Sequence, residues 1–217
     1  MPKKIVFMGT PMFAVPILKS LYQNGYPISD VYTQPPQKSQ RGQRINKSPI
    51  QGIAETLNLE FRTPKSLKNN NEEFEYFKSI NADLAVVVAY GQIIPKEFLN
   101  LTKKGFINIH ASLLPKWRGP APIQRSIMNL DKQTGISIMK INEKLDTGPV
   151  CSTYKLDIKD NDNAEIIFGH TVDETLGDAV EVTVVAAGFG PRPTRKPKDF
   201  DENQDSGGDG LPDFIKG

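Results

Sequence analysis

The chain has 217 residues, of which 38% are hydrophobic, and its formal net charge at pH 7 is +2. This length suits one ordinary domain with an appendage, and the small net charge excludes a polycation. The single cysteine, Cys151, excludes an internal disulfide and a cysteine-rich zinc site. The chain has no apolar run long enough for a signal peptide or a membrane span, so we expect a cytoplasmic protein without a membrane partner.

Strands and helices alternate through the first part of the chain. Apolar runs predict strands over residues 4–9, 29–34, 82–91, 105–110 and 135–141. Amphipathic periodicity predicts helices over residues 13–25, 48–58, 66–80 and near 122–130. Such alternation favours an α/β fold with a doubly wound, mostly parallel sheet.

The composition changes near residue 163, and we therefore divide the chain into three parts. Residues 1–162 form the α/β domain. Residues 163–190 form a strand segment, in which Val180–Ala187 pairs as a β-hairpin with residues 166–173. Residues 191–217 are too polar and too rich in Pro, Gly and Asp to bury a core, so we expect a disordered acidic tail. The tail ends in Leu211, Phe214 and Ile215, which suggest either a docking peptide or a frayed terminus.

Two polar residues end the buried strand at 105–110. Asn108 and His110 lie two positions apart, so their side chains project to the same side. Ligands of open α/β sheets bind beyond the carboxyl ends of the strands. An amide and an imidazole at such a place could stabilise a carbonyl oxygen as it becomes an oxyanion, and Asp146 could orient the imidazole and collect a proton. The same side chains could instead only satisfy backbone groups.

Other kinds of site have little support. The chain has only two histidines, His110 and His170, and one cysteine, so we expect no metal. Cys151 has no histidine close to it in sequence, which makes it a weak candidate nucleophile. Glycine-rich nucleotide-binding motifs are absent from the sequence.

The ordered motifs of residues 1–162 carry a family resemblance. The stretches "KIVFMGTPMFAVPIL", "ADLAVVVAYGQIIP", "GFINIHASLLPKWRGPAPIQRSI" and "TGISIMKINEKLDTGP" resemble the N-terminal catalytic domain of the methionyl-tRNA formyltransferases. The resemblance implies a truncated Rossmann-like domain that moves a formyl group from 10-formyltetrahydrofolate to the α-amino group of initiator methionyl-tRNA. Related formyltransferases that act on a nucleotide sugar or on glycinamide ribonucleotide share the Asn, His and Asp pattern, but the "RGQ" and "KSP" segments favour the tRNA enzyme.

The resemblance also implies a role for each site residue. Asn108 would hold the formyl oxygen, His110 would stabilise its negative charge, and Asp146 would position His110 and assist proton removal from the amine. The folate would lie against two segments, namely Ser112, Leu113, Leu114 and Pro115, and Val88, Ala89, Tyr90 and Gly91. The tRNA acceptor end would lie against a basic loop that contains Lys38, Arg41, Arg44 and Lys47. On charge alone this loop could equally be a solvated surface, and we expect the protein to be a monomer.

A second resemblance concerns the end of the chain. Residues 165–217 are similar to the C-terminal end of the bacterial cell-division protein FtsZ, and "LPDFIKG" is similar to its partner-binding peptide. An alternative function follows, in which the tail docks onto division proteins and the α/β part is only a scaffold. A sheet cut before its final helix would also expose an apolar face.

Overall fold

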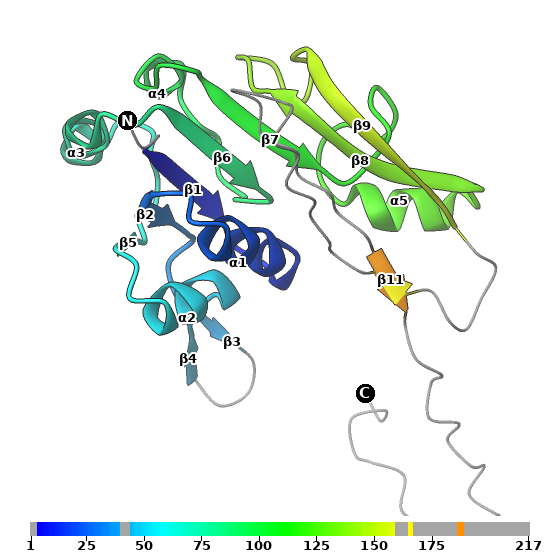
Figure 1. The fold of residues 1–217 in the computed structure, drawn as a ribbon, viewed down its shortest axis with the longest axis horizontal. Helices are drawn as coiled ribbons and strands as arrows, with labels where there is room; N and C mark the ends of the chain where they lie inside the picture. The colour runs from blue at the N-terminus through cyan, green and yellow to red at the C-terminus, as the bar shows by residue number, and fades with distance from the viewer. Residues whose placement is uncertain (1–3, 40–43, 159–164, 167–185, 189–217) are drawn as a thin grey trace, which may run out of the picture.

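A computed structural model describes residues 4–39, 44–158, 165–166 and 186–188 of the chain. Its body is a seven-stranded sheet with the strand order β5-β2-β1-β6-β7-β8-β9 (Figure 1). The strands are β1 (Ile5–Gly9), β2 (Ile28–Tyr32), β5 (Phe61–Arg62), β6 (Leu84–Val88), β7 (Phe106–His110), β8 (Gln133–Lys140) and β9 (Val150–Asp157). Pairing is parallel from β5 to β7 and antiparallel from β7 to β9.

Helices cover both faces of the parallel part of the sheet (Figure 1). They are η1 (Met12–Ala14), α1 (Val15–Gln23), α2 (Pro49–Thr56), α3 (Asn71–Ile80) and α4 (Lys96–Leu99), whereas α5 (Pro122–Met128) lies against β8. Leu18 of α1 and Ile50 of α2 pack in one hydrophobic cluster, and Phe77 of α3 and Phe98 of α4 pack in a second. The expected doubly wound, mostly parallel α/β fold is confirmed.

The central strands are buried over their whole length. Every residue of β1 and β6 is buried, because successive side chains enter the two clusters alternately. Phe7 and Val86 belong to the first cluster, whereas Met8 and Val87 belong to the second. A strand covered on both faces reads as a continuous apolar run, which is why these strands are easily recognised in the sequence.

A partly buried ion pair between Arg62 and Glu73 fastens α3 to the β2–β5 edge of the sheet. The Glu73 carboxylate accepts hydrogen bonds from the Tyr32 hydroxyl at 2.8 Å and from Nη2 of Arg62 at 2.9 Å. The Arg62 guanidinium also lies 3.9 Å from the centre of the Tyr76 ring, and the Tyr76 hydroxyl donates to Asp30. Burial raises the pKa of Tyr32, so its hydroxyl remains a donor to Glu73.

Three local features differ from the expectations. The helix expected over residues 66–80 begins at Asn71, because the Asn70 side chain caps it by accepting from the Glu73 amide at 3.1 Å. The polar loop after β2 contains the antiparallel strands β3 (Gln37–Ser39) and β4 (Arg44–Asn46). Finally, β8 is antiparallel to β7, because the loop and α5 that join them return to the edge of the sheet at which β7 ends.

In the C-terminal part, β10 (Glu165–Ile166) pairs with β11 (Ala186–Gly188) in an antiparallel arrangement. This agrees with the hairpin pairing expected there, although most of the strand expected over residues 180–187 lies outside the described residues. The acidic tail of residues 191–217 also lies outside them. The division of the chain at residues 162 and 190 therefore stays a prediction.

Candidate functional site

The two polar residues of β7 lie on one face of the sheet. His110 is buried and Asn108 is half-buried. The parallel register pairs Val87 of β6 with Asn108, so the end of β6 lies beside the polar end of β7. This placement agrees with a site at the carboxyl edge of the parallel strands.

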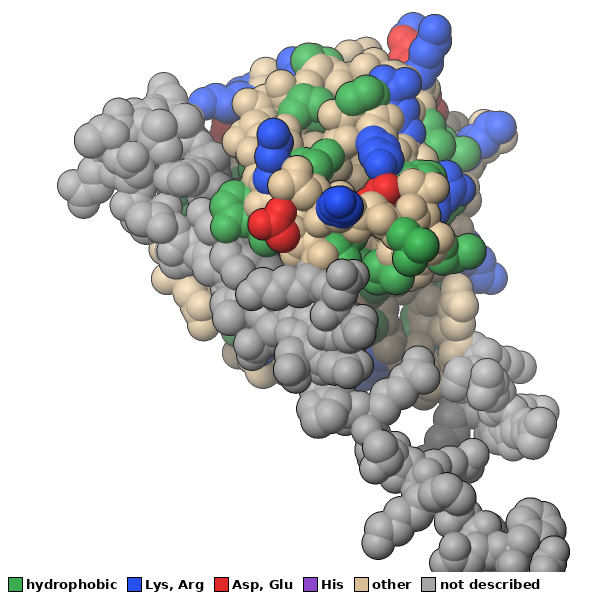
Figure 2. All heavy atoms as spheres, turned by 90° about the vertical axis from the view of Figure 1, so that its right-hand side faces the viewer, with side chains coloured by type: hydrophobic (Ala, Val, Ile, Leu, Met, Phe, Trp, Pro, Cys, Tyr) green, Lys and Arg blue, Asp and Glu red, His purple; other side chains and the backbone are tan. Residues whose placement is uncertain are grey.

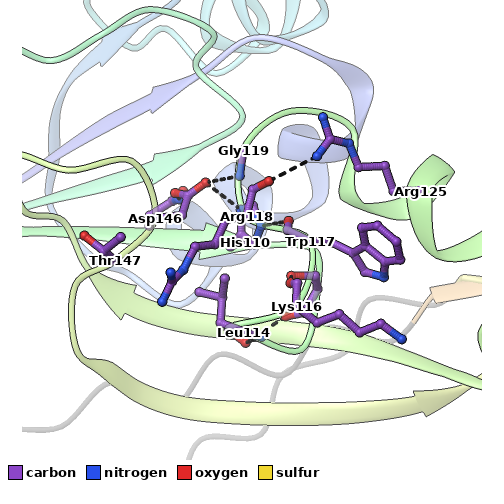
Figure 3. Close-up of polar contacts among 12 residues, drawn as sticks. His110, Leu114, Lys116, Trp117, Arg118, Gly119, Arg125, Asp146 and Thr147 are labelled. Carbon is purple, nitrogen blue, oxygen red and sulfur yellow. Dashed lines mark hydrogen bonds and ion pairs between the residues drawn. The ribbon is translucent and has the colours of Figure 1, made fainter.

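Asp146 reaches this face from the loop between β8 and β9. Because β8 runs antiparallel to β7, the loop leaves the sheet near Ile107, the partner of Lys140, and folds back over β7. The Asn108 amide donates to Oδ1 of Asp146 at 3.1 Å. Nδ1 of His110 lies 3.6 Å from Oδ2 of Asp146 (Figure 3). The structure therefore brings together the three side chains that the sequence singled out.

The turn that carries Asp146 is shaped by a residue that the sequence analysis missed. Asn142 accepts hydrogen bonds through its side-chain oxygen from the Lys144 amide at 3.1 Å and from the Thr147 hydroxyl at 3.0 Å. Asp146 itself has a φ of 45°, and the Gly148 backbone lies too close to the Lys140 carbonyl for a Cβ. An asparagine that precedes a turn was the available signal, since its side chain often bonds the backbone two residues ahead.

The loop after β7 contributes two backbone groups to the site. The Trp117 carbonyl lies 2.9 Å from Nε2 of His110, and the Gly119 amide donates to Oδ2 of Asp146 at 2.9 Å (Figure 3). A carbonyl oxygen only accepts, so Nε2 is the donor in this contact. Both ring nitrogens of His110 thus face oxygen atoms, Nε2 at hydrogen-bond distance and Nδ1 at 3.6 Å. Sequence reasoning had no signal for either backbone group.

Two buried serines, Ser112 and Ser137, hold the backbone of the loop at Ser112–Pro115, where we expect the folate. The Ser112 hydroxyl donates to the Lys116 carbonyl at 2.6 Å, and the Ser137 hydroxyl donates to the Ser112 carbonyl at 2.7 Å. Ser137 also accepts from the Leu114 amide. Ser112 is therefore committed to the loop, whereas Leu113 and Leu114 are half-buried and Pro115 is exposed.

The second proposed folate segment, at the end of β6, is only partly accessible. Val88 and Tyr90 are buried, and the Tyr90 carbonyl accepts from the Thr10 hydroxyl at 2.7 Å and from the Gln34 amide at 3.2 Å. Ala89 and Gly91 are exposed, and both have positive φ. Of these four residues, Ala89 and Gly91 are the two that a ligand beside Asn108 could reach directly.

A second carboxylate, that of Asp131, bonds the side chains of Lys116 and Trp117 in the loop after β7. Asp131 lies between α5 and β8, and its side chain is 6% exposed. It accepts hydrogen bonds from Nζ of Lys116 at 2.7 Å, Nδ2 of Asn129 at 2.7 Å and Nε1 of Trp117 at 2.6 Å. These donors, with Lys116 the strongest, lower the pKa of Asp131 to about 2. No motif or spacing in the sequence singled out Asp131.

The proposed tRNA-binding residues do not form one described cluster. Arg41 lies outside the described residues, and Lys38 and Arg44 belong to the paired strands β3 and β4. Lys47 is exposed and lies 2.9 Å from the Glu55 carboxylate of α2. Hydrogen bonds from Lys47 and Gln51 lower the pKa of Glu55, so this carboxylate offsets the charge of Lys47.

Among the described residues, no group of three or more His, Cys, Asp or Glu side chains is placed to hold a metal ion. Cys151 is exposed on β9. No helix in the described ranges is long and apolar enough to cross a membrane.

The β9 end of the sheet presents a mixed surface. Lys and Arg side chains predominate over Asp and Glu on this face, with hydrophobic side chains between them (Figure 2). Large hydrophobic residues of α5, β9 and the adjoining turns are exposed, namely Ile127, Met128, Leu130, Val150 and Tyr154. Seven of the eight residues of β9 are exposed.

Two curated relatives are similar in sequence to this chain. It is 74% identical to the methionyl-tRNA formyltransferase of Pelagibacter ubique (strain HTCC1062) over 167 residues, which are 77% of this chain and 54% of that protein. It is 46% identical to the methionyl-tRNA formyltransferase of Chelativorans sp. (strain BNC1) over 188 residues, which are 86% of this chain and 60% of that protein. The chain thus spans little more than half the length of the curated relatives it matches.

Solved structures share the fold. Phosphoribosylglycinamide formyltransferase from Bacillus halodurans superposes with a TM-score of 0.61 at 19% identity, covering 74% of this chain and 82% of that one. A formyltetrahydrofolate deformylase from Pseudomonas syringae gives a TM-score of 0.59 at 19% identity, covering 74% of this chain and 53% of that one. At this level of identity the likeness concerns the fold alone.

A family model supplies the remaining comparison. The model described as formyl transferase matches residues 3–182, which include Asn108, His110 and Asp146. The match continues past residue 162 into the segment that resembles FtsZ, and that second resemblance stays a prediction. From a match over this much of its length, we conclude that the chain belongs to the formyl transferase family.

Proposed function

We propose that this protein transfers the formyl group of 10-formyltetrahydrofolate to the α-amino group of methionine on initiator methionyl-tRNA. The observation that carries the proposal is the contact of one carboxylate, Asp146, with both Asn108 and His110. Relatives named methionyl-tRNA formyltransferase, with 74% and 46% identity, support the choice of acceptor.

The chemistry follows from what each side chain can donate or accept. The amine nitrogen attacks the formyl carbon, and the electrons of the C=O double bond move onto oxygen. One N–H of the Asn108 side-chain amide donates a hydrogen bond to Asp146, and the other N–H can donate to the developing oxyanion. The electrons on the oxyanion then re-form the C=O double bond as the bond from carbon to N10 of the folate breaks. N10 keeps the electron pair of the broken bond and takes up a proton in place of the one that the amine loses.

Asp146 handles the proton that the amine loses. As the attacking nitrogen becomes acidic, the Asp146 carboxylate accepts the proton directly or through a water, and His110 remains the charge-stabilising neighbour at 3.6 Å. The Nε2–H of His110 donates to the Trp117 carbonyl in this structure. For His110 to reach the formyl oxygen, this carbonyl must share or release that donor when the folate binds.

The substrates would lie on the segments that flank these three side chains. We assign the folate to Ala89 and Gly91 on one side and to the Leu113–Pro115 segment on the other, because these residues are not fully buried. We assign the tRNA acceptor end to the basic loop with Lys38, Arg41, Arg44 and Lys47, where binding would depend on charge. A monomer is sufficient for this arrangement.

The direct test is formylation of charged initiator tRNA by the purified 217-residue chain. The assay supplies 10-formyltetrahydrofolate and labelled methionyl-tRNA and measures formylmethionyl-tRNA, with Asp146→Asn as the matched variant. We expect transfer by the unmodified chain and a loss of about 10²-fold or more in the variant. Transfer to glycinamide ribonucleotide but not to methionyl-tRNA would replace the proposed acceptor, and equal rates in the two chains would remove Asp146 from the mechanism.

The tail-docking function is not supported by any described residue. It stays a prediction that a pull-down of division proteins with residues 199–217 can decide.

A further inference from the structure

The loop between β7 and α5 has an unusual backbone that needs support. Trp117 has a φ of 57° and Gly119 a φ of 82°, both in the left-handed region. For a residue with a bulky side chain such as Trp117 this conformation is unfavourable, so surrounding contacts must hold it. The same two residues supply the backbone groups that contact His110 and Asp146.

One carboxylate holds the side chains of this turn, in addition to the Ser112 hydroxyl that bonds the Lys116 carbonyl. Asp131 accepts from the Trp117 indole through Oδ2 at 2.6 Å and from the Lys116 ammonium through Oδ1 at 2.7 Å. The Lys116 ammonium also lies 5.5 Å from the centre of the Trp117 ring. In the close-up, the side chains of Lys116 and Trp117 extend away from Asp146, while the backbone between them faces His110 (Figure 3).

Asp131 is itself fixed at the end of α5. Its amide donates to the Ser126 carbonyl at 3.0 Å, and Asn129 donates to its side chain at 2.7 Å. Its side chain is 6% exposed, whereas that of Lys116 is 53% exposed. A carboxylate that accepts charge-assisted and neutral hydrogen bonds from three donors is held in one position.

We propose that Asp131 is a positioning residue for His110 and Asp146. By holding the Trp117 side chain, it fixes the left-handed turn that directs the Trp117 carbonyl at Nε2 of His110 and the Gly119 amide at Asp146. The chain of contacts runs from Asp131 to Trp117 and then to His110 through hydrogen bonds of 2.6 and 2.9 Å. The proposal deepens the proposed function and relies on it only for the kinetic readout.

The chain offers two direct spectroscopic readouts. Trp117 is its only tryptophan, so intrinsic fluorescence excited at the indole band reports on this residue. His110 and His170 are its only histidines, so two sets of imidazole signals are expected by NMR, and His110→Asn assigns them. Neither readout requires enzymatic activity.

The test compares Asp131→Asn with Lys116→Met. Asp131→Asn keeps the shape of the side chain but loses its charge and one acceptor. Lys116→Met removes one donor to Asp131 and leaves the hydrogen bond from the Trp117 indole to Asp131 in place. We expect Asp131→Asn to shift the Trp117 emission and the His110 signals, to leave the His170 signals in place, and to lower kcat about 10- to 100-fold with KM for the folate within about twofold. Lys116→Met should change each readout much less.

The outcomes separate a positioning role from a structural one. Unmoved His110 signals in a folded Asp131→Asn protein would overturn the proposal, even if its melting temperature falls. If this variant does not fold, Trp117→Phe removes the same hydrogen bond from the other partner, and unchanged His110 signals there would overturn the proposal as well. Shifted His110 signals in a chain whose unmodified form transfers no formyl group would support the positioning role while removing the proposed function.

Discussion

At the scale of single residues, the side-chain amide of Asn108 uses one of its two N–H groups in the described hydrogen bonds. One N–H of its side chain donates a hydrogen bond to Asp146 at 3.1 Å, and no described residue accepts one from the other. The spacing of Asn108 and His110 and the downstream Asp146 were readable from the sequence. The Trp117 carbonyl and the Gly119 amide were not, because which backbone group faces a ring depends on loop dihedral angles that no residue pattern encodes.

Asn108→Ala should lower the rate of formyl transfer about 10²- to 10³-fold, because it removes a donor to the developing oxyanion. Steady-state kinetics with charged tRNA measures this effect. Asn100→Ala, at an exposed position after α4, serves as the control and should leave the rate unchanged. A near-normal rate for Asn108→Ala would contradict the role assigned to this amide.

The lowered pKa of Asp131 predicts an acid-dependent contribution to stability. Its pKa is about 2 in the folded chain and 3.8 in its ordinary environment. The stabilisation is therefore complete above pH 3.8 and is lost as the pH falls towards 2. Urea unfolding should show that the gap between the unmodified chain and Asp131→Asn narrows over this range, and a gap that is independent of pH would contradict the assignment.

At the scale of elements, the sequence predicted those that bury a continuous or periodic apolar face. The direction of β8 could not be predicted from the sequence. The segment between β7 and β8 forms the site loop and the short helix α5, and it returns to the end of β7 without crossing the sheet, so β8 runs antiparallel to β7. The sequence also predicted a start of α3 at residue 66, whereas the helix begins at Asn71. The polar residues before Asn71 do not interrupt a helical pattern, and the cap made by the Asn70 side chain is what fixes the first turn. The missed elements are thus those fixed by local capping or by loop geometry.

The attachment of α3 to the sheet depends on Glu73. Glu73→Ala should lower the free energy of unfolding by about 3 kcal/mol, because it leaves the Tyr32 hydroxyl buried without its acceptor and Arg62 without its partner. Glu75→Ala on the same helix removes an exposed pair with Lys78 and should cost less than about 1 kcal/mol. Chemical denaturation of both variants measures the difference, and equal costs would contradict the proposed anchor.

The pairing of Lys47 with Glu55 predicts how the basic loop binds tRNA. Glu55→Ala frees Lys47 and should lower KM for methionyl-tRNA a few-fold while making it more sensitive to salt. Glu75→Ala makes the same change in net charge on α3 and is the control. A decrease of the same size in both variants would assign the effect to overall charge and not to the loop.

At the scale of the whole molecule, the site combines side chains from β7 with a loop that leaves the antiparallel part of the sheet. The parallel strands carry Asn108 and His110, and the added strands β8 and β9 carry Asp146 between them. Neither part holds all three groups. Correct pairing of β7 with β8, in the register that sets His110 opposite Ser137, is therefore a condition for the site to form.

The place of β9 as the last strand of the sheet has a consequence for the protection of its backbone. Its alternate amide hydrogens point away from β8, and seven of its eight residues are exposed, whereas β1 lies between β2 and β6 with every residue buried. Deuterium should therefore replace these protons within β9 long before it enters β1. Mass spectrometry of peptic fragments would record that gradient, and uniform labelling across the strands would show that they open together.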